Sequence, residues 1–310
     1  MDGKALTQVF LEAVDEVSVD MVNVDLRSVY EHLDIAAIAF VRELGQLSAS
    51  AAITTVEGQQ DYDLPPDFIR LQVKNRKAQF IAKYSDGSNT YWPVLENYDD
   101  LYRRNLSDSK SAPGTFAVVG KATAASLVTG VTTAAGAVAA GEAILTASAA
   151  TFSTSVHARD RVYNNTGQGA GIVLAVTDTT HLKCALFPEG LDSWGSGDAY
   201  TIQPAAIRQI HLDAPSLTAG HTLTVPYVAM PAPVYSEHGF WRIDPKSCFA
   251  IAHEAAYFYM MNRPKKKPNR FHHDLFLQEV RQVKVDIAVE TLGSRQYRPD
   301  NKEIYRWGLY

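Results

Sequence analysis

The sequence GQQDYDLPPDFIRL, residues 58–71, holds the most informative local pattern of this chain. Gly58 suits a turn, because glycine adopts positive φ angles at no steric cost. Tyr62 and Leu64 stand two residues apart, so they supply one buried face of a short strand. The prolines that follow end this strand before another begins at Phe68.

The chain on either side of this pattern alternates in the manner of short strands separated by turn residues. Expected strands lie at 53–56, 60–64, 68–74, 79–84 and 90–95, and again at 207–212 and 223–228. Between the two groups, residues 122–203 differ in composition. A stretch rich in Ala, Thr, Ser and Gly comes first, and segments with a clearer alternation of apolar and polar residues follow it. Because the flanking strands resume after this segment, we interpret it as an inserted antiparallel β-sandwich or barrel.

Helices are expected at both ends of the chain. Apolar residues recur at three- and four-residue steps over 6–17 and 26–47, the spacing of one helical face. Asp244-Pro245 predicts the start of a third helix, with Asp as cap and Pro at the first helical position. A fourth is expected around 276–287. The apolar face of an amphipathic helix must pack against another surface. These helices therefore predict a bundle that brings the two ends of the chain together.

The expected fold class is therefore α+β: a four-helix bundle formed by the N- and C-terminal helices, a small β region and the inserted β domain. We divide the chain into an N-terminal part of the core at 1–121, the insertion at 122–203, a C-terminal part of the core at 204–293 and an extended arm at 294–310.

Composition is that of a soluble globular protein, with 46% apolar and 20% charged residues among 310. No run approaches the roughly 18 unbroken apolar residues of a membrane span. The first residues lack a basic region followed by an apolar one, so neither a membrane contact nor a secretory signal is expected. Two cysteines, Cys184 and Cys248, exclude a disulfide framework and favour a reducing compartment.

The net charge of −5 conceals an asymmetry. Acidic residues dominate before Tyr62, and basic residues dominate from Arg263 onward. Opposite charges at two ends favour packing against further copies of the chain. Two ordinary solvated faces explain the same pattern equally well.

No motif predicts catalysis, a cofactor or a metal. The glycine-rich residues 167–171 precede a β-branched strand, which predicts a turn and not a phosphate loop. His253-Glu254 begins like the helical zinc motif, but Tyr257 stands where the second histidine is needed. His272 and His273 splay apart on a helix, which favours capping or surface roles over metal binding.

One compact basic cluster lies in the expected turn between the last two helices. It carries no interleaved aromatic residues on which bases would stack. Contact with DNA phosphates along a channel is one interpretation, and a solvated turn or a contact between subunits is favoured over it. The cluster consists of Lys265, Lys266, Lys267 and Arg270.

The segment after Gly293 is too short to build a core of its own, yet it is rich in aromatic and basic residues. Tyr, Trp and Arg dominate binding hot spots, so we interpret this segment as a docking arm. The alternative is a tail folded back on its own helices. The residues of the expected arm are Tyr297, Arg298, Ile304, Tyr305, Arg306, Trp307, Leu309 and Tyr310.

The order of these pieces resembles the tail-adaptor, or head-completion, proteins of tailed bacteriophages. Residues 58–71 are similar to the family's Gly-x-x-x-Tyr-x-Leu-Pro-x-Asp-Phe unit. PGTFAVVG at 113–120 and IHLDAP at 210–215, which leads to residues 223–227, continue the resemblance, and the last two helices complete it. The insertion at 122–203 departs from the compact family pattern, which leaves its role open.

The resemblance implies a structural protein, not an enzyme, that forms a ring of twelve subunits at the head-to-tail interface of the virion. Such a ring is assembled in the host cytoplasm and uses no cofactor. Its implied partners are further copies of itself, the portal protein, a tail or nozzle protein and the passing genomic DNA, which is contacted without sequence specificity. C-terminal extensions in such rings commonly reach into the portal, which agrees with the arm.

Two other classes of protein stay open. One is a tail or baseplate component whose inserted domain binds carbohydrate or a host surface, with Trp194 and Tyr163 as stacking residues. The other is a cell-wall hydrolase, which no motif recommends.

Overall fold

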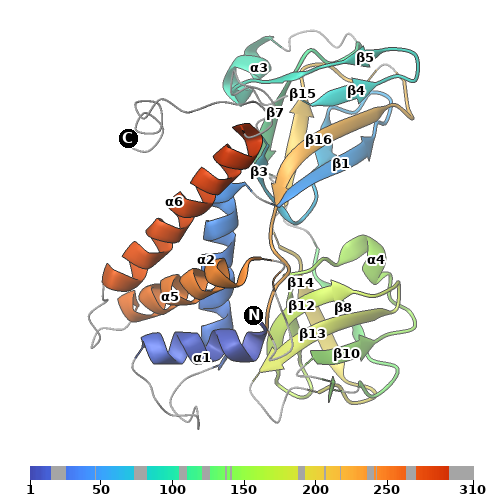
Figure 1. Cartoon of the computed structure of the whole chain (residues 1–310). Coiled ribbons are helices and arrows are strands. Elements are labelled where there is room, and N and C mark those ends of the chain that lie inside the picture. The colour runs from blue at the N-terminus through green and yellow to red at the C-terminus, as the bar shows by residue number, and fades with distance from the viewer. Residues whose placement is uncertain are drawn as a thin grey trace. The chain divides into compact units, whose positions relative to one another are not determined.

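The computed structural model describes residues 1–14, 26–45, 47–72, 82–104, 110–120, 126–136, 138–139, 142–187, 193–205, 207–216, 218–235, 241, 243–262 and 270–292. The chain divides into two compact units, one made of Met1–Leu44 with Val234–Tyr310 and the other of Gly45–Pro233. Within the described residues the fold is mostly β, with six helices; helix accounts for 32% and strand for 33%. Figure 1 labels these elements.

The first unit is helical, and one helix lies at its centre. Helix α5 packs against each of the other three. Its residues Ala252, Ala255 and Ala256 are fully buried, and their small side chains allow the neighbouring helices to approach closely. The four helices are α1 (Gly3–Ala13), α2 (Leu26–Leu44), α5 (Pro245–Met261) and α6 (Arg270–Leu292).

The expected four-helix bundle is wrong, because no clear bundle of the terminal helices forms among the described residues. In Figure 1, α2 crosses α1 and α5 steeply and does not run alongside them. An amphipathic stripe requires cover, but it specifies neither the partner nor the crossing angle. The expected start of α5 is confirmed: the Asp244 side chain accepts a hydrogen bond from the backbone N–H of Lys246 at 2.9 Å, and Pro245 is the first helical residue.

The second unit contains two small sheets built around the 58–71 pattern. One has the order β1-β16-β4-β5, with β3 also paired to β16, and all its pairs are antiparallel. The other has the order β2-β15-β7-β6, in which β6 and β7 are parallel. The elements are β1 (Ser48–Thr54), β2 (Asp61–Asp63), β3 (Phe68–Leu71), β4 (Lys83–Ser85), β5 (Thr90–Tyr91), β6 (Val94–Leu95), α3 (Tyr98–Arg104), β7 (Thr115–Gly120), β15 (Arg208–Leu212) and β16 (Thr222–Ala229).

The 58–71 pattern folds as its sequence predicts. Gly58 has a φ of +76°, and strands follow at β2 and β3. Tyr62 is buried, and its hydroxyl donates to the carbonyl oxygen of Gln59 at 2.9 Å, which fixes the turn before β2. Tyr62, Leu64 and Phe68 belong to one hydrophobic core cluster shared by the two sheets.

The inserted segment forms one seven-stranded antiparallel sheet with the order β8-β14-β11-β12-β13-β10-β9. It has a core of its own, which includes Leu145, Phe152 and Trp194. A single sheet therefore stands where a sandwich or barrel was expected, and the fold contains a half-barrel sheet. The elements are β8 (Val128–Val131), β9 (Val138–Ala139), β10 (Glu142–Thr146), α4 (Phe152–Ser155), β11 (Arg161–Asn164), β12 (Ala170–Val176), β13 (His181–Phe187) and β14 (Ala199–Gln203).

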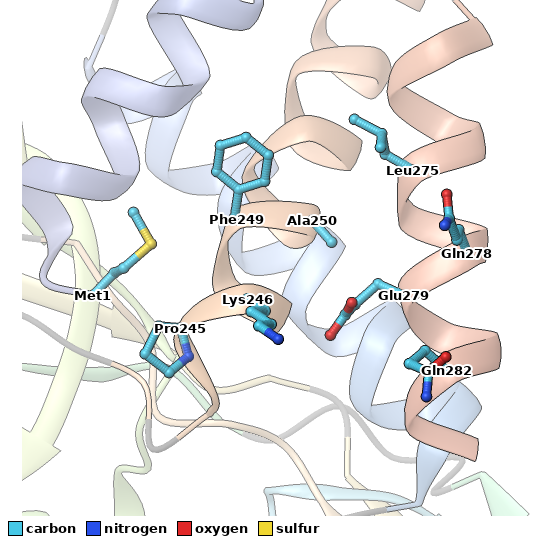
Figure 2. A pocket seen from close by; sticks show the side chains of 9 residues that line it. All are labelled: Met1, Pro245, Lys246, Phe249, Ala250, Leu275, Gln278, Glu279 and Gln282. Atoms are coloured by element: carbon cyan, nitrogen blue, oxygen red, sulfur yellow. The ribbon is translucent and has the colours of Figure 1, made fainter. Parts of the chain in front are cut away.

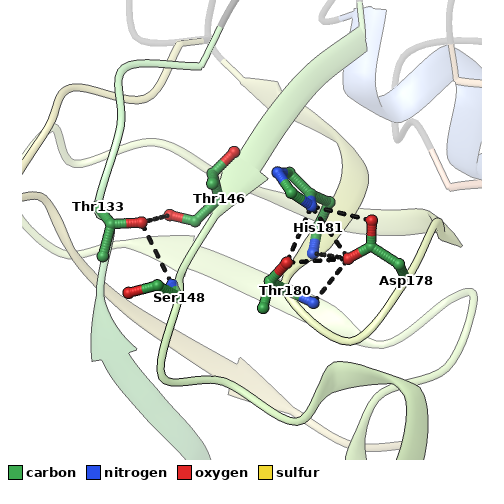
Figure 3. Close-up of polar contacts among 6 residues, drawn as sticks. All are labelled: Thr133, Thr146, Ser148, Asp178, Thr180 and His181. Atoms are coloured by element: carbon green, nitrogen blue, oxygen red, sulfur yellow. Dashed lines mark hydrogen bonds and ion pairs between the residues drawn. The ribbon is translucent and has the colours of Figure 1, made fainter.

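After β8, one backbone bond extends its pairing with the neighbouring strand β14, and another joins it to β10 near the far edge of the sheet. The N–H of Thr132 donates to the carbonyl oxygen of Asp198, beside β14, at 2.9 Å. The N–H of Thr133 donates to the carbonyl oxygen of Thr146, at the end of β10, at 2.8 Å. Figure 3 shows Thr133 beside Thr146 and Ser148. Alternation in the sequence indicates which side chains face inward, but closure depends on these long-range bonds.

The insertion leaves and rejoins the four-stranded sheet at one point. Gly120, at the end of β7, and Arg208, at the start of β15, are direct partners across the antiparallel pair. Residues 121–207 therefore replace what is otherwise the turn of a β-hairpin. The domain bounds given above stay predictions.

Candidate interaction surface

An open pocket of about 550 Å³ lies between α5 and α6 in the helical unit. Figure 2 shows side chains of the two helices on either side of it, with Met1 nearby. Phe249 is 46% exposed, which is high for so large an apolar side chain. The pocket is lined by Met1, Pro245, Lys246, Phe249, Ala250, Leu275, Gln278, Glu279 and Gln282.

Helical spacing produces both walls. Residues 246, 249 and 250 share one face of α5, and residues 275, 278, 279 and 282 share one face of α6, because positions three and four apart are neighbours on a helix. A polar contact joins the walls: the Ser247 hydroxyl donates to the Glu279 carboxylate at 3.0 Å. The groove is therefore mostly apolar, and one hydrogen bond between side chains joins its two walls.

Two histidines meet further along the same pair of helices. The Nδ1 atoms of His253 on α5 and His272 on α6 lie 2.8 Å apart, and their rings are within 13° of parallel. The Phe249 ring stands edge-on to His253 with centroids 4.4 Å apart. Burial, and secondarily the neighbouring His272, lower the pKa of His253, which favours its neutral form.

A second pair lies one residue further on each helix. The buried Glu254 carboxylate contacts Nδ1 of His273 at 2.9 Å, and the Tyr257 ring stacks on His273 with centroids 5.1 Å apart. Burial raises the pKa of Glu254, and the His273 contact opposes that rise. Breaking such a pair leaves a buried charge uncompensated, so we assign it a role in holding α5 to α6.

Further large apolar side chains are exposed on this unit. Met261 at the end of α5 and Phe271 at the start of α6 are 57% and 58% exposed, and Ile35 on α2 is 53% exposed. Isolated apolar side chains of this size are common on protein surfaces, and Trp92 and Tyr102 of the other unit are as exposed. The helical unit is the candidate interaction surface because it also carries the apolar groove between α5 and α6.

The residues expected from sequence to form the docking arm, Tyr297, Arg298, Ile304, Tyr305, Arg306, Trp307, Leu309 and Tyr310, lie outside the described residues. So do Lys265, Lys266 and Lys267. Arg270 is the first residue of α6 and is exposed. The arm and the basic cluster stay predictions.

Sequence reasoning missed the groove and the histidine pair. The signals were present, since both helices and both histidines were identified, but helical periodicity does not reveal which faces of two helices meet. It also proposed Trp194 as a sugar-stacking residue, and this is wrong. Trp194 is buried, and its Nε1–H donates to Sγ of Cys184 at 3.1 Å.

Across the described ranges, no group of three or more His, Cys, Asp or Glu side chains could hold a metal ion. No helix in that part of the chain is both long and apolar enough to cross a membrane. Comparison with known protein families and with curated proteins found no family model and no protein that matches this chain.

Proposed function

We propose that this chain is a structural subunit of the connector that joins the capsid portal to the tail in a tailed bacteriophage. It assembles as a ring, expected to contain twelve copies, docks on the portal, extends the DNA channel and attaches the tail or nozzle. The proposed role places the chain in the virion as a structural protein, not an enzyme, which contacts passing DNA without sequence specificity.

One observation carries the proposal. The three segments that resemble the adaptor family are distant in sequence, yet each supplies a strand of the same sheet: β2 from 58–71, β7 from 113–120 and β15 from 210–215. Chance matches have no reason to become neighbours across an intervening insertion. Their pairing supports the view that they form a single inherited structural unit.

The helical unit supports the proposal in a second way. A connector subunit contacts copies of itself and at least two other proteins, so it needs apolar surface that its own fold leaves uncovered. Phe249, Met261 and Phe271 provide such surface on α5 and α6. Affinity in a ring is summed over many copies, so each contact can be modest.

The rival proposal of a carbohydrate-binding tail or baseplate component is weaker, because Trp194 is buried and cannot stack on a sugar.

Quantitative mass spectrometry of purified virions tests the connector proposal. The chain is expected in intact particles at about the same copy number as the portal subunit. Its absence from virions, or a copy number far from that of the portal, would contradict the proposal.

A further inference from the structure

The contact between His253 and His272 is an arrangement with metal-binding chemistry. The two residues are 19 positions apart and come from different helices, yet their Nδ1 atoms lie 2.8 Å apart. A direct contact of this kind requires a proton between two imidazole nitrogens, with one ring donating and the other accepting. One N–H and one nitrogen lone pair are thus directed into one small region, and moving that hydrogen to the other nitrogen of its ring frees a second lone pair there.

Imidazole nitrogen is a preferred ligand of Zn²⁺, Ni²⁺ and Cu²⁺, whereas Mg²⁺ and Ca²⁺ require oxygen. With Zn–N bonds of about 2.05 Å, two nitrogens of a tetrahedral site stand about 3.3 Å apart. The present 2.8 Å separation is therefore only about half an ångström short of the span that such an ion requires. A small rotation of the two rings away from each other supplies it.

The two histidines face each other, and neither takes part in the neighbouring contact between Glu254 and His273. His253 is partly exposed, which gives access for an ion. The adjacent Glu254 and His273 are bonded to each other and form a separate contact. The local sequence also explains why α5 alone shows no zinc motif. Tyr257 occupies the position at which the motif has its second histidine, and the second imidazole comes from His272 on α6.

We propose that His253 and His272 together bind one borderline transition-metal dication, such as Zn²⁺, Ni²⁺ or Cu²⁺, through their Nδ1 atoms, with water completing the coordination. The hydrogen now held between the rings moves to an Nε2 atom, so both imidazoles remain neutral and no net charge is lost from the protein. The bound ion links α5 to α6. This inference does not depend on the connector proposal.

Isothermal titration of the untagged full chain with ZnCl2 tests the site. We expect one site per chain whose affinity falls at least about tenfold, or about 1.4 kcal/mol, in either His253→Gln or His272→Gln. The matched control is His181→Gln, in the inserted sheet and away from α5 and α6. It is expected to stay within about twofold of the wild-type affinity.

Electron paramagnetic resonance with Cu²⁺ gives a second readout, with two nitrogen ligands expected in the wild type and one in His253→Gln. Unchanged affinity in both site variants, or an equal loss in His181→Gln, would overturn the proposal. If His272→Gln fails to fold by circular dichroism, the more exposed His253→Gln decides the outcome. Virion composition is measured separately, so failure here leaves the connector proposal untouched.

Discussion

Gly171 illustrates how one missing side chain permits a sheet to form. It lies in β12, where it pairs with Val162 on one side and Leu186 on the other. A Cβ atom at this position would overlap the carbonyl oxygen of Ala185 and approach the Ala185 carbonyl carbon to 2.7 Å. The obstacle is backbone within a paired strand, so it cannot turn aside as a side chain would.

Gly171→Ala is therefore expected to lower the free energy of unfolding by at least about 3 kcal/mol, the upper range for overpacking. The matched control is Gly120→Ala, also in a strand, where nothing lies within 4 Å of the added methyl group. Urea unfolding of both variants measures the difference. Near-equal stabilities would contradict the packing described for β12 and β13.

Single residues also show where sequence reasoning is reliable and where it is not. Gly58 and Tyr62 were assigned correctly, because a turn and its buried tyrosine depend on local order alone. Trp194 was misjudged, because nothing local distinguishes a buried tryptophan from an exposed one. His253 and His272 were each dismissed as ligands on local grounds, and their contact arises only when two helices pack.

At the scale of elements, the hairpin between β12 and β13 is fixed by one carboxylate. Asp178 accepts hydrogen bonds from the backbone N–H groups of Thr180 at 2.7 Å and His181 at 2.9 Å, and its carboxylate also contacts Nδ1 of His181 (Figure 3). Chiefly through the Thr180 N–H bond, these contacts lower the pKa of Asp178 from 3.8 to about 2.

A carboxyl group with a lowered pKa in the folded state stabilises the fold above its ordinary pKa, and this stabilisation is lost as pH falls through the folded value. The contribution of Asp178 should therefore disappear between about pH 4 and about pH 2. In Asp178→Asn, the stability deficit relative to wild type is expected at pH 5 and should shrink over that window. Urea unfolding across pH measures this, and a deficit that stays constant down to pH 2 would refute it.

Helix ends and strand positions followed from sequence better than helix packing did. Asp244-Pro245 predicts the start of α5 because capping is local chemistry. The bundle failed because four amphipathic stripes are compatible with many arrangements, and the one found gathers α1, α2 and α6 around α5. The groove at Phe249 is a consequence of that arrangement and has no local signature.

At the scale of the whole molecule, the insertion is expected to be separable from the sheets that carry it. Gly120 and Arg208 are paired opposite each other, and the inserted sheet has its own core. Replacing residues 121–207 by a two-residue Asn-Gly turn, which suits a tight hairpin, should leave a protein that unfolds cooperatively. Circular dichroism with urea unfolding measures this; a molten or aggregated product would contradict it.

The complementary fragment, residues 126–205, provides the matching control. Trp194 is its one tryptophan and is buried in the sheet core. If the insertion folds alone, the fluorescence of this fragment should be blue-shifted and should move to longer wavelength on unfolding.

The predicted docking arm is also tested on the whole molecule. Changing Tyr305, Trp307 and Tyr310 together to alanine is expected to abolish portal binding and to leave the fold intact, because these residues are the aromatic anchors of the arm. The control removes exposed aromatic side chains elsewhere, at Trp92 and Tyr102, which are 59% and 66% exposed. Unchanged portal binding by the triple variant would refute the arm.

Mass photometry of the purified protein, alone and mixed with the portal of the same phage, decides whether the chain is a connector. We predict one large complex that carries about twelve copies of the chain on each portal ring, even if the free protein is a monomer, since such assembly is concentration-dependent and templated. Two separate species with the masses of the free chain and the free portal would rule out the connector role.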